Sequence, residues 1–202
     1  MQLDHSNLIK IAICGRANSG KNTIAQILAH RLCDHPKEYA MLAFADPIKE
    51  MAMIMFPWAD PECLYGASHL RNNTIPYAKN EFGEPLTYRQ ALIDIGTQGR
   101  RYKPDIWVDV MDHRIQKMPL KEQEGIEKRL LLITDLRFVN EMDYLVRKGF
   151  FVIKVLRDTP LLINHGTETE QEKIPENDFD FILENNADLE TLRNKVYSIE
   201  LE

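Results

Sequence analysis

The feature that most constrains this chain is the stretch GRANSGKNT, residues 15–23, which directly follows the apolar run LIKIAIC. The run, residues 8–14, is short and rich in β-branched residues, so it predicts a buried strand. Residues 20–33 then place apolar side chains on one face of a predicted helix. A strand, a glycine-containing loop and a helix in this order are the context in which such a loop binds phosphate.

The loop nearly matches the pattern G-x-x-x-x-G-K-[ST]. Gly15, Gly20 and Lys21 are in register, but Asn22 stands where Ser or Thr is usual and Thr23 comes one residue late. Glycines let backbone N–H groups converge on phosphate oxygens, and the lysine reaches the β- and γ-phosphates. A surface turn with a solvated lysine is the alternative, and the flanking strand and helix argue against it.

The position after the lysine usually supplies a hydroxyl that helps hold Mg²⁺. Adenylate-kinase-like enzymes, which act on small phosphorylated acceptors, resemble this stretch in carrying a different residue there, followed by Thr. The departure therefore favours a nucleotide-kinase type of loop over a GTPase-like switch. Either Asn22 offers its amide oxygen to Mg²⁺, or water and the phosphates of ATP hold the ion.

Apolar runs later in the chain alternate with helical patterns. They predict strands at residues 39–45, 129–134, 150–156 and 178–183. Alternating strands and helices predict an α/β fold, with a parallel sheet of about five strands covered on both faces. Ligands of such sheets bind beyond the carboxyl ends of the strands, so the residues that follow each strand carry the functional predictions.

The long section between the second and third predicted strands, residues 46–129, is mainly helical by pattern. Helices are expected near 47–56, 87–98 and 105–117. The C-terminal residues predict an amphipathic helix with Asn186 as its N-cap. We therefore expect one domain over residues 1–202, with a helical insertion and a cover loop near 157–175.

Composition excludes some function classes. The net charge of −6 argues against a broad nucleic-acid-binding surface. The three cysteines are far apart in sequence and form no C-x-x-C pair, which favours reduced thiols. The N-terminus does not resemble a signal peptide and no apolar run is long enough to span a membrane. We expect a cytoplasmic protein without a membrane or nucleic-acid partner.

Seven segments between about residues 8 and 193 occur together in a recognisable order. They are SGKNT, FADPIKE, LYGASHLRN, YRQALIDIGTQGRRYKPDIWVDVM, LLLITDLRFVNEMDYLVRKGFFVIKVLR, HGTETE and FDFILENNADLETL. This ordered set resembles the phage-type deoxynucleoside monophosphate kinases, a family of P-loop nucleotide kinases. Phosphomevalonate kinase and dephospho-coenzyme A kinase resemble parts of it.

The resemblance implies a P-loop NTPase three-layer sandwich and a transferase of nucleotide metabolism. The donor is ATP with Mg²⁺, the acceptor is a deoxynucleoside monophosphate, and the compartment is the host cytoplasm if a phage encodes the chain. The expected ATP-binding residues are Gly15, Asn18, Ser19, Gly20, Lys21, Asn22, Thr23 and Asn185. The expected catalytic residues are Lys21, Asp135, Arg137 and Arg157, with Asn22 and Asp135 as candidate metal ligands.

The expected acceptor-binding residues are Asp46, Lys49, Arg71, Arg89, Arg100, Trp107 and Arg137. Arginine suits this task because it stays charged and grips phosphate oxygens in pairs. Each arginine taken alone is about as well explained by a solvated surface position. Arg101 and Lys103 are expected to face solvent. Trp107 either stacks on a base or, in better agreement with its helical spacing, lies in a core or an interface.

Alternatives remain for three other positions. Asp46 is either near the acceptor or a helix cap. Asp135 either orients Mg²⁺ or its waters, or lies near the acceptor nucleotide as the resemblance suggests, or is a helix N-cap or part of a surface turn. Arg157 begins a segment expected to cover the reaction centre, in which His165, Thr167 and Glu168 match an H-x-[ST]-E pattern or form a solvated loop.

Two other functions remain open from the sequence. One is a kinase for another small phosphorylated acceptor, and the less favoured one is an NTPase linked to nucleic acid. The accepted bases, the exclusion of ribonucleotides and the oligomeric state, with a homodimer among the options, are not set by the sequence.

Overall fold

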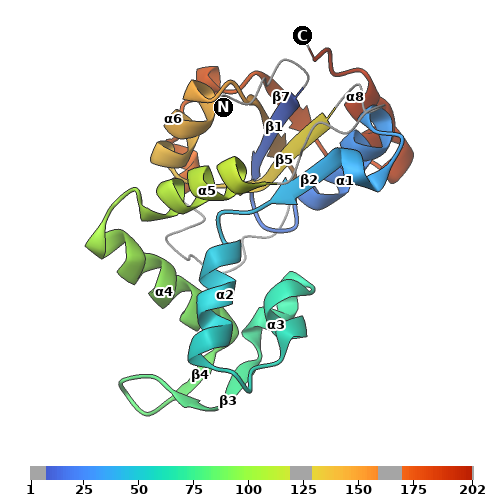
Figure 1. The fold of residues 1–202 in the computed structure, drawn as a ribbon. Helices are drawn as coiled ribbons and strands as arrows, with labels where there is room; N and C mark the ends of the chain where they lie inside the picture. Colours follow the sequence, from blue (N-terminus) through green and yellow to red (C-terminus); the bar gives the residue numbers. More distant parts are fainter. Residues whose placement is uncertain (1–7, 119–128, 159–169, 202) are drawn as a thin grey trace. The chain divides into compact units, whose positions relative to one another are not determined.

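The computed structural model describes residues 8–118, 129–158 and 170–201 of the chain (Figure 1). The chain divides into two compact units, Met1–Ala43 with Lys117–Glu202, and Phe44–Gln116. None of the helices in the described part of the chain has the length and apolar character that a membrane span requires.

The first unit is built on a parallel sheet of five strands (Figure 1). The strands are β1 (Leu8–Gly15), β2 (Tyr39–Leu42), β5 (Arg129–Leu136), β6 (Phe151–Leu156) and β7 (Phe181–Glu184). Their order in the sheet is β2-β5-β1-β6-β7, and every neighbouring pair is parallel. The predicted α/β fold with a five-stranded parallel sheet is confirmed.

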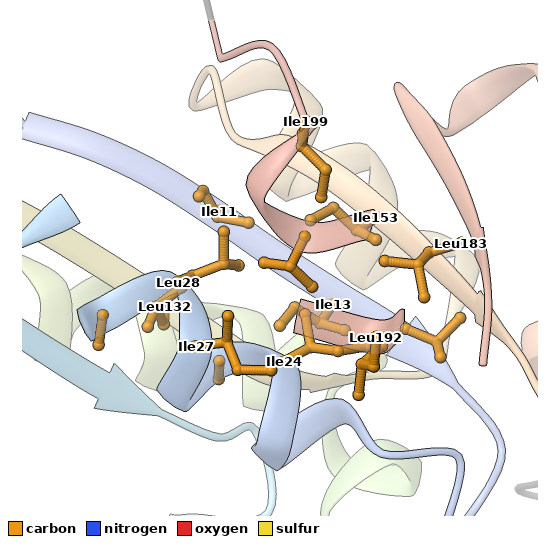
Figure 2. Packing of buried hydrophobic residues seen from close by; sticks show 14 of the residues in the cluster. Ile11, Ile13, Ile24, Ile27, Leu28, Leu132, Ile153, Leu183, Leu192 and Ile199 are labelled. Carbon is orange, nitrogen blue, oxygen red and sulfur yellow. The ribbon is translucent and has the colours of Figure 1, made fainter. Parts of the chain in front are cut away.

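Helices cover both faces of this sheet. The helices α1 (Lys21–Leu32) and α8 (Leu189–Tyr197) pack against each other on one face, and α6 (Val139–Arg147) lies on the other (Figure 1). Figure 2 shows the core between α1, α8 and the sheet, where Leu28 of α1 lies beside Ile11 of β1 and Ile24 of α1 lies beside Ile13 of β1. Because side chains alternate along a strand, Ala12 and Cys14 of β1 project to the opposite face.

Several predicted boundaries in this unit are wrong, among them the end of the third strand, which runs to Leu136 and not to residue 134. The second strand ends at Leu42 instead of residue 45, because Ala45 already has helical geometry. The last strand begins at Phe181, because residues Glu176–Asp178 form a 3₁₀ turn. Asn186 does not cap the last helix: Asp188 is the N-cap and accepts from the backbone N–H of Thr191 at 2.8 Å.

The second unit combines helices with a hairpin. Its elements are α2 (Asp46–Met55), α3 (Pro61–Tyr65), the 3₁₀ turn η2 (Ser68–Asn72), β3 (Thr74–Lys79), β4 (Pro85–Thr87), α4 (Tyr88–Tyr102) and α5 (Ile106–Lys117). The three predicted helices correspond to α2, α4 and α5. The antiparallel pair β3–β4 was not predicted, because its strands are short and mostly exposed and lack a regular apolar alternation.

Candidate functional site

The loop between β1 and α1 has a backbone that only certain residues adopt. Gly15, Asn18 and Gly20 have φ angles of 153°, 61° and 98°. A Cβ atom on Gly15 would lie 2.8 Å from the hydroxyl oxygen of Ser19, and one on Gly20 would lie 2.4 Å from the amide nitrogen of Asn185. Both glycines of the pattern are therefore required by backbone conformation and by space.

Donors from the surrounding elements bind the carbonyl groups of this loop. Lys21 Nζ donates to the carbonyl oxygens of Gly15 and Arg16, each at 2.7 Å. Asn185 Nδ2 donates to the Ser19 carbonyl at 2.8 Å, and Arg157 Nη1 lies 3.4 Å from the Asn18 carbonyl. The loop is thus held by contacts to its carbonyls from α1, from the end of β6 and from the end of β7.

The start of α1 is suited to an anion. The helix begins at Lys21, its N-cap Gly20 offers no side-chain cap, and its first turn carries no acidic residue. The first N–H groups of a helix have no partner within the helix, and its dipole is positive at this end. No carboxylate of the first turn itself neutralises this end, so a phosphate group fits it.

Ser19 gives a second indication of a binding site. Its side chain is fully buried, and among the buried side-chain nitrogen and oxygen atoms of the described residues only its hydroxyl lacks a hydrogen-bond partner. Leaving such a group unsatisfied costs about 1–3 kcal/mol, and native proteins keep few of them. An unsatisfied hydroxyl within a loop of this geometry fits a site for a hydrogen-bonding ligand.

Positive charge gathers around Cys14, near the carboxyl ends of three strands. Burial raises the pKa of the Cys14 thiol to about 11, while the cations of Lys21, Lys154 and Arg137 act in the opposite direction. These cations come from α1, from β6 and from the residue after β5. The structure therefore places the predicted residues Lys21 and Arg137 within electrostatic range of the same thiol.

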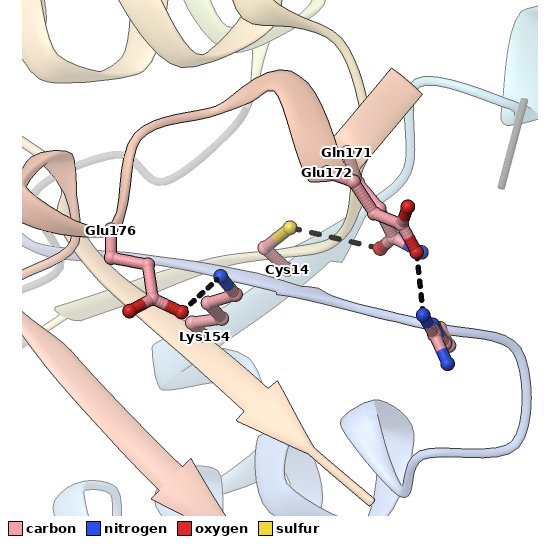
Figure 3. Close-up of polar contacts among 6 residues, drawn as sticks. Cys14, Lys154, Gln171, Glu172 and Glu176 are labelled. Atoms are coloured by element: carbon pink, nitrogen blue, oxygen red, sulfur yellow. Dashed lines mark hydrogen bonds and ion pairs between the residues drawn. The ribbon is translucent and has the colours of Figure 1, made fainter. Parts of the chain in front are cut away.

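Sequence reasoning missed Lys154. It is the one charged residue in the apolar run FFVIKVL, and that contrast was the available signal. Its ammonium pairs with Glu176 at 3.0 Å (Figure 3). It also lies 5.2 Å from the centre of the Phe179 ring. Lys154 is therefore anchored against the 176–179 segment.

A pocket of about 640 Å³ opens beside the loop on the Cys14 face of the sheet. The ends of β1 and β6 and residues 171–176 line it. Two contacts join its lining residues: Cys14 Sγ donates to Gln171 Oε1 at 3.9 Å (Figure 3), and Arg16 pairs with Glu172 at 2.5 Å. Its volume is in the range of small-molecule sites.

Asp135 lies inside β5, one residue before the strand ends, and is half-buried. It does not cap the following helix. Instead the buried carboxylate of Glu141 accepts the backbone N–H groups of Arg137 and Phe138, at 3.0 and 3.2 Å. The N-cap of α6 is Phe138, so the helix-cap alternative for Asp135 is wrong, and its roles at a metal ion or at the acceptor stay predictions.

The described residues contain no group of three or more His, Cys, Asp or Glu side chains that could hold a metal ion. Mg²⁺ commonly keeps several water ligands and binds one or two carboxylates together with substrate phosphates. The half-buried Asp135 and the exposed Asn22 fit that mode of binding and do not form an all-protein cage.

The predicted acceptor-binding cations of the second unit are half-buried and hydrogen-bonded. Arg89 donates to Asn72 Oδ1 and to the Ser68 carbonyl, both at 2.9 Å, and so holds the turn η2. Arg71 Nε lies 3.4 Å from the Leu64 carbonyl, and Arg100 Nη1 lies 3.3 Å from the Gly96 carbonyl.

The start of α2 contains an ion pair between Lys49 and Asp46 at 3.0 Å, and Lys49 also lies 5.3 Å from the centre of the Tyr65 ring. Asp46 is the first helical residue and Ala45 is the N-cap, so the capping alternative for Asp46 is wrong. Arg101 and Lys103 are exposed, as expected, and Lys103 pairs with Asp109.

Trp107 belongs to the core of the second unit. Only 4% of its surface is exposed, its indole N–H donates to the Gly96 carbonyl at 3.0 Å, and a Cβ on Gly99 would lie 2.4 Å from its ring. A ring packed in this way is not available to stack on a base. The core alternative is therefore correct, and Trp107 is removed from the predicted acceptor-binding residues.

The predicted cover loop is described only at its ends. Arg157 and Asp158 follow β6, and residues 170–175 return along the pocket. His165, Thr167 and Glu168 lie outside the described residues, so the H-x-[ST]-E prediction stays a prediction.

Comparison with known proteins adds a relative in sequence. No protein-family model matches the chain. A protein of Acanthamoeba polyphaga mimivirus described as "Putative deoxynucleotide monophosphate kinase" is 26% identical over 199 residues, which cover 95% of each chain.

Two solved structures are similar at a lower level. TT1252 from Thermus thermophilus is 16% identical, with a TM-score of 0.41 over 95% of this chain and 96% of its own. Dephospho-CoA kinase from Campylobacter jejuni is 13% identical, with a TM-score of 0.41 over 93% of this chain and 92% of its own. By its five-stranded parallel sheet and the glycine-bearing loop after β1, the chain has an α/β fold, and by sequence it is a distant homologue of the mimivirus protein.

Proposed function

We propose that the protein transfers the γ-phosphoryl group of ATP to the 5′-phosphate of a deoxynucleoside monophosphate, giving the diphosphate and ADP. The observation that carries this proposal is the loop before α1: two glycines in conformations that other residues avoid, a lysine in register, and a helix start without an acidic residue. The name of the mimivirus relative supports the choice of acceptor.

The chain's own groups would act mainly by positioning and by charge. The loop and the start of α1 would hold the β- and γ-phosphates, and Lys21 would turn from the Gly15 and Arg16 carbonyls toward them. Arg137 would bind acceptor phosphate oxygens, and Arg157, which already contacts the loop, would approach the transferred group. Transfer between two anions depends chiefly on in-line placement and charge neutralisation.

No strong general base is required in this scheme. A phosphate monoester has its second pKa near 6, so the acceptor is already mostly deprotonated at neutral pH. When bound, Mg²⁺ neutralises part of the charge on the phosphates, and Asn22 and Asp135 are the residues that we propose hold the ion or its water ligands. Lys49, Arg71, Arg89 and Arg100 of the second unit remain the proposed acceptor-binding cations.

A kinase for another small phosphorylated acceptor is the second candidate. The loop and the cations are compatible with any phosphorylated acceptor, because they recognise the phosphate and not the rest of the molecule. The aspartate–lysine pair at the start of α2 and the arginines of the second unit do not distinguish a base from another group.

One assay separates these candidates. Purified protein is incubated with ATP, Mg²⁺ and one acceptor from a panel of deoxynucleoside monophosphates, ribonucleoside monophosphates, phosphomevalonate and dephospho-coenzyme A. ADP release is coupled to NADH oxidation, and the product is identified by chromatography. We expect a diphosphate product with at least one deoxynucleoside monophosphate. ATP hydrolysis that DNA stimulates, without transfer to any acceptor, would contradict the proposal.

A further inference from the structure

Asn185 lies where the last strand of the sheet meets the phosphate loop, which we define as residues 15–21. It directly follows β7, and its backbone N–H donates to the Leu156 carbonyl of β6 at 2.8 Å. Its side-chain amide donates to the Ser19 carbonyl at 2.8 Å, across 166 positions of sequence. The backbone contact fixes the residue to the sheet, and the side-chain contact fixes the loop to the residue.

We infer that Asn185 is a positioning residue that holds the phosphate loop in its ligand-binding conformation from the end of β7. This inference rests on the proposed function, because it assigns a role within the proposed triphosphate site. It also differs from the direct contact with ATP expected from the sequence, since only 5% of the surface of Asn185 is exposed and its amide is directed at the loop.

Burial explains why this single contact matters. Ser19 is fully buried, so its carbonyl cannot exchange the amide of Asn185 for bulk water. A buried acceptor that loses its partner carries the full desolvation penalty. The peptide that follows this carbonyl supplies the backbone N–H of Gly20, next to the start of α1. If this peptide rotated so that the carbonyl met another donor, the Gly20 N–H would rotate with it. The geometry of the phosphate site would then change.

Close packing at Gly20 supports the same assignment. The amide of Asn185 occupies the space in which a Cβ of residue 20 would stand, at 2.4 Å from that position. The side chain of Asn185 therefore leaves room only for glycine at position 20, and the left-handed φ of Gly20 favours the same residue. No shorter side chain at position 185 would both fill this space and reach the Ser19 carbonyl.

The test compares Asn185→Asp and Asn185→Ala with the parent protein and with the control Asn186→Ala. Aspartate has nearly the same shape but no N–H donor when ionised, and alanine removes the contact without adding charge. Asn186 is the adjacent residue of the same type, but its side chain contacts Asp158 and not the loop. Calorimetry measures binding of ATP and of ADP, and steady-state assays measure kcat and both KM values.

We expect Asn185→Ala to raise the dissociation constant of ATP about tenfold, the effect of losing one buried hydrogen bond, with a larger rise for Asn185→Asp. The acceptor KM should change less than twofold, and Asn186→Ala should retain ATP affinity within twofold. A residue that only supports the fold would lower the active fraction and leave the dissociation constant unchanged. Unchanged ATP affinity in both folded Asn185 variants would overturn the inference.

Failure of the proposed function gives a different result, because the parent protein then forms no diphosphate from any deoxynucleoside monophosphate, whatever its affinity for ATP. If neither Asn185 variant folds, hydrogen exchange on the ligand-free parent protein decides. The backbone amide of Ser19, which donates to the Arg16 carbonyl at 3.2 Å, should be protected to a degree comparable with β7, because Asn185 fixes the Ser19 peptide to the end of that strand. Exchange of the Ser19 amide at the rate of a solvated turn, with β7 protected, would also overturn the inference.

Discussion

A methyl group on Gly20 tests the loop geometry most directly. In Gly20→Ala the alanine would have to keep a φ near 98°, and its Cβ would stand 2.4 Å from Asn185 Nδ2. The left-handed conformation alone costs a residue with a Cβ about 1–2 kcal/mol. Displacing the amide of Asn185 breaks its bond to the Ser19 carbonyl, which adds about 1–3 kcal/mol. The expected loss of unfolding free energy is the sum, about 2–5 kcal/mol.

A matched control separates the two contributions. Gly149 also has a left-handed φ, 71°, but a Cβ there would meet nothing within 4 Å. Gly149→Ala should therefore cost only the conformational part, about 1–2 kcal/mol. In an Asn185→Ala background, Gly20→Ala should likewise cost about 1–2 kcal/mol, because the amide that it would displace is gone.

Urea unfolding followed by circular dichroism gives these free energies, and the four proteins of the Gly20–Asn185 cycle give the coupling between the two positions. We expect a coupling of about 1–3 kcal/mol. Equal costs of Gly20→Ala in the two backgrounds, within about 0.5 kcal/mol, would show that the two residues do not restrict each other. That result would refute the packing argument for the loop.

Three further predictions test other parts of the molecule. Lys21→Ala should keep the far-ultraviolet circular dichroism of the parent and lose about 100- to 1,000-fold in kcat, because it removes the ammonium group that would lie beside the transferred phosphate. A kcat equal to that of the parent would refute the loop assignment. Arg137→Ala should raise the acceptor KM more than it raises the ATP KM. An acceptor KM equal to that of the parent protein would remove Arg137 from the site. The folded-state pKa of Cys14 is about 11 against an ordinary value of 9.0, so its contribution to stability is present below pH 9 and is lost between pH 9 and 11. In urea unfolding, the free energy of unfolding should therefore fall less between pH 8 and pH 10.5 for Cys14→Ala than for the parent. An equal fall in both proteins would contradict the burial of the thiol.

Local patterns were sufficient for much of the fold. The strands of the sheet and the helices α1, α2, α4, α5 and α8 follow from runs of apolar residues at strand or helix spacing. The phosphate loop was recognised because its glycines and Lys21 are neighbours in sequence. The hairpin β3–β4 and the ends of β2 and β7 were not predicted, since they depend on capping and tertiary packing more than on periodicity.

The sequence by itself determined that a strand, a glycine-bearing loop with Lys21 and a helix follow one another, because these features depend on residues close together along the chain. Only the tertiary structure decided that Asn185 holds Ser19, that Lys154 and Arg137 approach Cys14, and that Trp107 is a core residue. These contacts depend on which strands become neighbours and on which face each side chain projects from. The strand order β2-β5-β1-β6-β7 places β6 beside β1 and β7 beside β6, although long stretches of sequence separate them.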